Sequence, residues 1–166
     1  MKQNTITLGI LNLNSLAYLK DQIINLDKLF KDVPEKYYNR LKVLILDNCS
    51  DDDSISFLKK KSNNISWLNF YAHPRRISYD ENVLSVYKKC TTDYLWLLAN
   101  DDLILNSNVI IQIFDILDKY KPSGINFATS SKVEDITDKI NKQNIFQFKN
   151  SELCLDTILK GGKISS

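Results

Sequence analysis

The chain has 166 residues, 43% of them hydrophobic and 25% charged, a composition typical of one globular domain with a substantial core. Its formal net charge is only +2 and its lysines are scattered, so charge does not indicate nucleic-acid binding. The three cysteines are odd in number and far apart, and no apolar stretch reaches about 18 uninterrupted residues. These features argue against a disulfide framework and a membrane-spanning helix, and predict reduced thiols in the cytoplasm.

Strands and helices alternate from the N-terminus onward. Residues 6–13 form an apolar run typical of a strand, and apolar side chains then recur at helical spacing from Leu16 to Phe30, ahead of Pro34. A second apolar strand is predicted at residues 41–47. Beyond it we expect an acidic loop with the sequence NCSDDDS, and then a short helix at 54–61.

The second half of the pattern repeats this alternation. The predicted elements are a strand at 65–72, a turn at Pro74, a helix carrying Val83, Val86, Tyr87 and Cys90, a strand at 94–99, a helix from about 109 to 120 and a strand at 125–129. Such alternation predicts a mostly parallel, doubly wound sheet flanked by helices, in a three-layer α/β/α arrangement. After residue 130 no clear period remains.

Acidic residues follow two of the predicted strands. Asp47 ends the strand at 41–47, and Asn100, Asp101 and Asp102 follow the apolar strand at 94–99, which we expect to be buried on both faces. Parallel strands end at one edge, where open α/β sheets bind ligands, so these carboxylates suit a divalent cation that carries a diphosphate. The alternative is an acidic turn or a helix N-cap.

Other candidate ligands are few. Neither GxGxxG nor GxxxxGK[ST] occurs, which disfavours a Rossmann dehydrogenase and a P-loop NTPase. His73 is the single histidine and is predicted to be a turn residue. Arg75 and Arg76 could meet a diphosphate, although a salt bridge or open surface is the more ordinary role for such a pair.

Three ordered motifs resemble the family 2 glycosyltransferases of the GT-A fold, especially bacterial members that build surface polysaccharides. The motifs are ILNLNSLAYLKDQI, LKVLILDNCSDDDS and YDENVLSVYKKCTTDYLWLLANDDLI, within residues 5 to 130. The resemblance implies a GT-A, Rossmann-like fold with a nucleotide-sugar-binding domain at residues 1–130. Residues 131–166 would then begin an acceptor-binding region that this chain does not complete.

The resemblance also implies roles for individual residues. Asp102 and Asp101 would bind Mn²⁺ or Mg²⁺, with Asp101 also close to the ribose, and Asp47 would contact the base of the nucleotide. The nucleotide-binding residues implied in this way are Asn12, Asn14, Asp47, Asn48, Asn82 and Asp101.

The chain departs from the family pattern at three places near these motifs. Asn100 stands where the first acid of the metal motif is usual, and keeps an oxygen that can accept a hydrogen bond or bind a cation. Cys49 replaces a usual Gly or Ala, which the loop accommodates if the φ angle there is negative. Asn14-Ser15 lacks the Arg or Lys that usually follows the Asn.

The activity implied is inverting, metal-assisted transfer from a nucleotide-diphosphate sugar, with a UDP-sugar as first choice, to a saccharide or lipid-linked acceptor. The catalytic base is expected beyond Ser166, and no base is assigned. The protein is expected in the cytoplasm, including peripheral association with the inner face of the membrane. The alternatives are a truncated nucleotide-binding module without transfer activity and a phosphoacceptor receiver domain, whose acidic pair and Lys are not at the required places.

Overall fold

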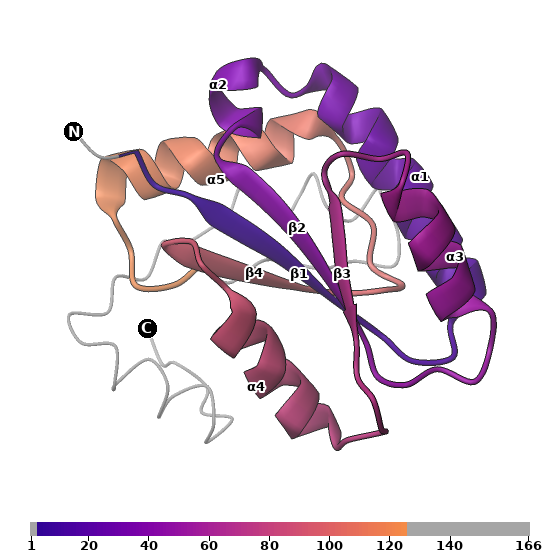
Figure 1. Ribbon diagram of the computed structural model, residues 1–166. Coiled ribbons are helices and arrows are strands. Elements are labelled where there is room, and N and C mark those ends of the chain that lie inside the picture. The colour runs from indigo at the N-terminus through magenta and orange to yellow at the C-terminus, as the bar shows by residue number, and fades with distance from the viewer. Residues whose placement is uncertain (1–2, 126–166) are drawn as a thin grey trace. The chain divides into compact units, whose positions relative to one another are not determined.

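A four-stranded parallel sheet forms the centre of the part of the chain that the structure describes. The computed structural model describes residues 3–125 (Figure 1). The strand order is β3-β2-β1-β4, and every neighbouring pair is parallel. The strands are β1 (Ile6–Asn12), β2 (Leu41–Asp47), β3 (Leu68–Ala72) and β4 (Tyr94–Ala99). The chain therefore steps outward from β1 to β3 and then returns to the other side of β1, which makes the sheet doubly wound.

Helices cover both faces of this sheet. They are α1 (Leu16–Asp32), α2 (Glu35–Tyr38), α3 (Ser54–Ser62), α4 (Tyr79–Lys89) and α5 (Ser107–Tyr120). Right-handed crossovers place α1 and α3 on one face, because both connections step in the same direction, and place α4 on the other face, against β1 and β2 (Figure 1). The predicted three-layer α/β/α fold is confirmed.

The core lies between the sheet and the helices α1 and α5. Leu8 and Ile10 of β1, together with Ile45 of β2, have no exposed surface. The helical period of α1 explains its burial, since residues three and four positions apart face the sheet. Its buried side chains are Leu19, Gln22, Ile23, Leu26, Leu29 and Phe30.

The element boundaries differ from the sequence predictions at a few places. β3 begins at Leu68 and not at residue 65, because the Ile65 amide bonds back to the Lys61 carbonyl and continues the turn of α3. α5 begins at Ser107, two residues early, and the short helix α2 was not predicted. Tyr87 of α4 is 68% exposed and does not belong to the buried stripe.

The prediction that β4 is buried on both faces is wrong for the described residues. Leu98 is buried, but Leu97 is 38% exposed. The reason is that β4 is the end strand of the sheet within residues 3–125. The predicted strand at 125–129 lies outside the described residues, apart from Ile125, which is not in a strand.

The chain divides into two compact units, residues 1–118 and residues 119–166. The first unit contains the whole sheet and the helices α1 to α4. The predicted domain boundary at residue 130 lies outside the described residues and stays a prediction. No helix in residues 3–125 has the length and apolar character needed to cross a membrane.

Candidate functional site

Polar side chains stand at the carboxyl end of each strand in the sheet. Asn12 ends β1, Asp47 ends β2, His73 directly follows β3, and Asn100 directly follows β4. The backbone joins neighbours along this edge, since the Asn48 amide donates to the Asn12 carbonyl and the His73 amide to the Asp47 carbonyl, both at 2.9 Å. The strand order reverses between β1 and β4, and ligands of open α/β sheets bind beside such a point.

Asp47 is the most enclosed member of this edge. Its side chain is fully buried and accepts three hydrogen bonds. The Ser50 amide donates to Oδ1 at 2.8 Å, while the Ser50 hydroxyl and Asn12 Nδ2 donate to Oδ2, both at 2.7 Å. Three donors compensate for the loss of water around the carboxylate, so Asp47 holds the loop after β2 against β1.

Asn12 links that carboxylate to β4. Its side chain is only 1% exposed, and its Oδ1 accepts a hydrogen bond from Asn100 Nδ2 at 3.1 Å. A chain of hydrogen bonds therefore runs from Asn100 through Asn12 to Asp47. The structure thus brings together two of the predicted site residues and the residue that departs from the metal motif.

Asn48 and Asn82 fasten the loop after β3. The Asn48 side chain donates to the Ile77 carbonyl and accepts from the Ile77 amide, both at 2.9 Å. Asn82 is 3% exposed, and its Oδ1 lies 3.1 Å from His73 Nε2. An amide oxygen can only accept, so the His73 ring donates here, and the Asn82 amide nitrogen makes no hydrogen bond to another described residue.

The loops after β1 and β2 hold each other. Asn14, exposed and at φ 50°, accepts from the Asp51 amide at 2.7 Å and donates its own amide to Ser50 Oγ at 2.9 Å. Asp52 accepts from the amides of Leu16 and Ser54, so it caps the start of α1 from another loop. Burial raises the pKa of the Asp52 carboxyl, but these hydrogen bonds outweigh it and bring the pKa below its ordinary value.

Cys49 has a φ angle of 58°, in the left-handed region. We expected the loop to accommodate a cysteine here if the φ angle is negative. The observed φ angle is positive, so that expectation is wrong. Side chains with a Cβ are strained in this conformation, whereas glycine is not. Cys49 is half-buried and its thiol is free.

Asp101 and Asp102 form the exposed part of the edge. The Asp102 amide bonds to the Ala99 carbonyl at 3.2 Å, which closes a turn, and no hydrogen bond or ion pair joins either carboxylate to another described residue. Two free carboxylates suit Mg²⁺ or Mn²⁺, which prefer oxygen ligands and accept water and phosphate oxygens as well. Within residues 3–125 no three His, Cys, Asp or Glu side chains are grouped to hold a metal ion.

Two residues outside the predicted site set turn out to belong to its surroundings. Arg76 pairs with Asp51 at 2.6 Å, which confirms the salt-bridge alternative for that arginine. His73 was predicted to be a turn residue, yet its ring pairs with Asn82. The available signal was its position, because it follows a predicted strand at the same edge as Asp47.

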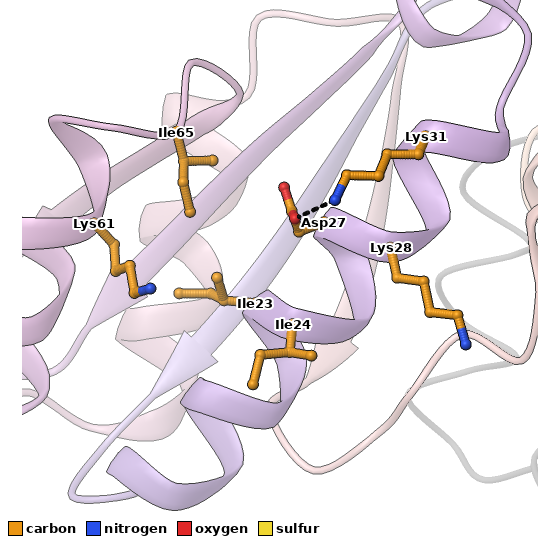
Figure 2. A pocket seen from close by; sticks show the side chains of 7 residues that line it. All are labelled: Ile23, Ile24, Asp27, Lys28, Lys31, Lys61 and Ile65. Atoms are coloured by element: carbon orange, nitrogen blue, oxygen red, sulfur yellow. Dashed lines mark hydrogen bonds and ion pairs between the residues drawn. The ribbon is translucent and has the colours of Figure 1, made fainter.

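A separate hollow of about 280 Å³ lies between α1 and α3 (Figure 2). Its lining includes Ile23 and Ile24 of α1 with Lys61 of α3, and the ion pair between Asp27 and Lys31 stands at its side. None of the predicted site residues lines it. The edge of the sheet therefore remains the candidate site.

Solved structures with a similar backbone include TarS and a mannosyltransferase. TarS from S. aureus matches with a TM-score of 0.60 and 17% identity, over 77% of this chain and 38% of TarS. The mannosyltransferase PcManGT from Pyrobaculum calidifontis, in complex with GDP-Man and Mn²⁺, matches with a TM-score of 0.58 and 14% identity, over 72% of this chain and 34% of the enzyme. TarS in complex with UDP-GlcNAc matches with a TM-score of 0.56 and 18% identity, over 77% of this chain and 37% of that one.

These likenesses define the fold as the GT-A type, a Rossmann-like α/β fold. This chain spans 34% to 38% of the length of these three structures. Residues 20–160 match the sequence pattern of Glycosyl transferase family 2, and the chain belongs to that family. No curated protein matches the chain.

Proposed function

We propose that the edge formed by the ends of β1, β2 and β4 binds the donor of a glycosyl transfer reaction, a nucleotide-diphosphate sugar. The observation that carries the proposal is the pair of free, exposed carboxylates, Asp101 and Asp102, beside the point where the strand order reverses in a family 2 chain. Complexes of similar structures with GDP-Man and Mn²⁺ and with UDP-GlcNAc support this class of ligand.

In this proposal Asp102 and Asp101 would hold Mn²⁺ or Mg²⁺, cations that also accept phosphate oxygens and water. The bound cation would neutralise the diphosphate and so favour its departure from the sugar. Asn14 is exposed in the loop after β1, and the Asn82 amide nitrogen makes no hydrogen bond to another described residue. Both side chains are suited to hydroxyl or phosphate oxygens of the nucleotide.

Asp47 and Asn48 border the nucleotide less directly. Both side chains already have hydrogen-bond partners in the chain. The Asp47 carboxylate accepts three hydrogen bonds and is fully buried, so a contact with the nucleobase would require the groups that cover it to move. A UDP-sugar is our first choice of donor, because TarS, whose backbone is similar, is known in complex with UDP-GlcNAc.

The reaction we propose is a single displacement at the anomeric carbon. The acceptor hydroxyl, of a saccharide or a lipid-linked saccharide, attacks as its proton passes to a carboxylate base, and the nucleoside diphosphate leaves with the electron pair of the broken bond. We assign no base among the described residues. Surface-polysaccharide synthesis, a cytoplasmic location and peripheral membrane association belong to the same proposal.

The test is a thermal-shift screen of UDP, GDP, CDP and dTDP with and without Mn²⁺. We expect one nucleotide with Mn²⁺ to raise the melting temperature by about 5 °C or more at about 100 times its Kd. Asp102→Asn should remove the part of the shift that depends on Mn²⁺. The matched control is Asp21→Asn, a change to an exposed carboxylate of α1, which should leave the shift intact.

Two results would contradict the proposal. One is a screen in which no nucleotide stabilises the wild-type chain, and the other is an Mn²⁺-dependent shift that survives Asp102→Asn. The alternative is a nucleotide-binding module without transfer activity. It would bind the nucleotide at the same edge of the sheet but would not transfer the sugar. Mn²⁺-dependent binding of a sugar nucleotide without release of the nucleoside diphosphate would favour that module.

A further inference from the structure

Asn100 stands at the position where the family resemblance places the first acid of the metal motif, yet its side chain forms a hydrogen bond with another residue of the chain. Its Nδ2 donates to Asn12 Oδ1 at 3.1 Å, across the boundary between β4 and β1. Asn100 is half-buried, unlike the exposed Asp101 and Asp102 that follow it. This contact connects residues 88 positions apart in the sequence.

The chemistry of the neighbours determines the direction of this hydrogen bond. The Asp47 carboxylate takes its bonds from the Ser50 amide, the Ser50 hydroxyl and Asn12. An amide oxygen cannot donate to a carboxylate, so the nitrogen of the Asn12 side chain must face Asp47. The Asn12 oxygen then points the other way, toward Asn100, and can only accept.

Asparagine supplies the donor that this position requires, and aspartate does not. An ionised Asp at position 100 would direct acceptor oxygens at the Asn12 oxygen. It would also place a second negative charge near the buried carboxylate of Asp47. Asn12 and Asp47 are at most 1% exposed, so water cannot replace the missing donor without opening the edge of the sheet.

We propose that Asn100 is a positioning residue and not a weakened metal ligand: it holds the turn that carries Asp101 and Asp102 against β1, where those carboxylates meet the diphosphate and its cation. This inference rests on the proposed function. It means that ligand binding does not require an acid at position 100. Asn100 belongs to the Asn100–Asn12–Asp47 network, and only the two acids that follow it face the ligand.

The experiment measures two affinities by isothermal titration calorimetry, Mn²⁺ alone and UDP with and without Mn²⁺, for the wild-type chain, Asn100→Ala and Asn100→Asp. We expect the factor by which Mn²⁺ tightens UDP binding to fall about tenfold in both variants. A loss of general stability alone would leave that factor unchanged. We also expect that Asn100→Asp does not tighten the binding of Mn²⁺ alone.

One result would overturn the inference. If Asn100→Asp binds Mn²⁺ more tightly than the wild-type chain and keeps the Mn²⁺ effect on UDP, the position is a metal-ligand position and the inference is overturned. If the wild-type chain binds no nucleotide, that result would instead contradict the proposed function.

A second measurement does not depend on nucleotide binding. Urea unfolding of Asn100→Ala, Asn12→Ala and the double variant forms a cycle that isolates the coupling between the two side chains. We expect the double variant to be less destabilised than the sum of the single variants. Additive effects would show that the hydrogen bond does not hold the turn, and would overturn the inference even if the proposed function stands.

Discussion

Single residues at the edge of the sheet have roles set by the hydrogen bonds that their backbone and side chains make. Cys49 is the clearest case, because its left-handed φ of 58° follows directly after Asn48, whose side chain is bonded on both sides to Ile77. Arg76 also donates to the Cys49 carbonyl, at 3.4 Å. The loop is therefore held in a conformation that suits glycine better than cysteine.

We expect Cys49→Gly to be more stable than Cys49→Ala by about 0.5–1 kcal/mol. Relief of the left-handed strain contributes about 1–2 kcal/mol, and the greater freedom of glycine in the unfolded chain offsets part of it. Urea unfolding of the two variants measures the difference directly. Because both variants lack the thiol, equal stabilities would show that the backbone at position 49 is not strained.

At the scale of elements, the contact between β1 and α4 depends on a glycine. A Cβ at Gly9 would lie 2.6 Å from Val86 Cγ1, which is too close, and 3.0 Å from Leu95 Cδ1, which is a tight contact. Val86 is fully buried and cannot turn away into solvent. The absence of a side chain at Gly9 therefore sets how closely α4, which carries Asn82, approaches the sheet.

Gly9→Ala should destabilise the chain by about 1–3 kcal/mol through overpacking. In the double variant Gly9→Ala/Val86→Ala, the space left by the valine should accept the new methyl group. The double variant should then lose less stability than the two single variants lose in total, as measured by urea unfolding. A strictly additive result would place the strain elsewhere than at Val86.

At the scale of the first unit, Arg40 joins segments that are far apart in the sequence. Its guanidinium donates to both oxygens of Asp118 at 2.7 and 2.9 Å, its Nε donates to the Asn4 carbonyl at 2.7 Å, and it lies 4.3 Å from the Phe114 ring. Arg40 is buried, and the hydrogen bonds from its guanidinium lower the pKa of the Asp118 carboxyl below its ordinary value. The start of β1, the start of β2 and the end of α5 meet at this one ion pair.

The lowered pKa determines the pH dependence of this ion pair. Its stabilisation is complete above the unfolded pKa of about 3.9 and is lost as the pH falls through the lower folded value. Asp118→Asn should lower the free energy of unfolding by about 1–2 kcal/mol at pH 7. This figure already allows for screening of the ion pair by solvent, because the Asp118 side chain is 41% exposed. Urea unfolding between pH 7 and pH 3 should show the gap to wild type narrowing below about pH 4.

A matched control is Asp27→Asn, which breaks the exposed pair between Asp27 and Lys31 on one face of α1. We expect this variant to lose less than about 0.5 kcal/mol at any pH, because solvent screens the pair. A gap between wild type and Asp118→Asn that stays constant down to pH 3 would contradict the role assigned to the Arg40 ion pair.

The order of elements and the parallel sheet could be predicted because hydrophobic period is a local property. The stripe from Leu19 to Phe30 and the apolar run at 94–99 indicate their elements without reference to the rest of the chain. Asp47 and Asp101 could be placed at one edge for a similar reason, since parallel strands end together. The assignment of individual nucleotide and metal contacts stays a prediction.

The sequence by itself determined the alternation of strands and helices, the polar edge of the sheet and the resemblance to family 2. Only the tertiary structure decided the left-handed backbone of Cys49, the pairing of His73 with Asn82 and the bond from Asn100 to Asn12. The physical reason is range. Burial periods repeat every two to four residues, whereas the direction of a side-chain hydrogen bond depends on which distant group can donate and which can only accept.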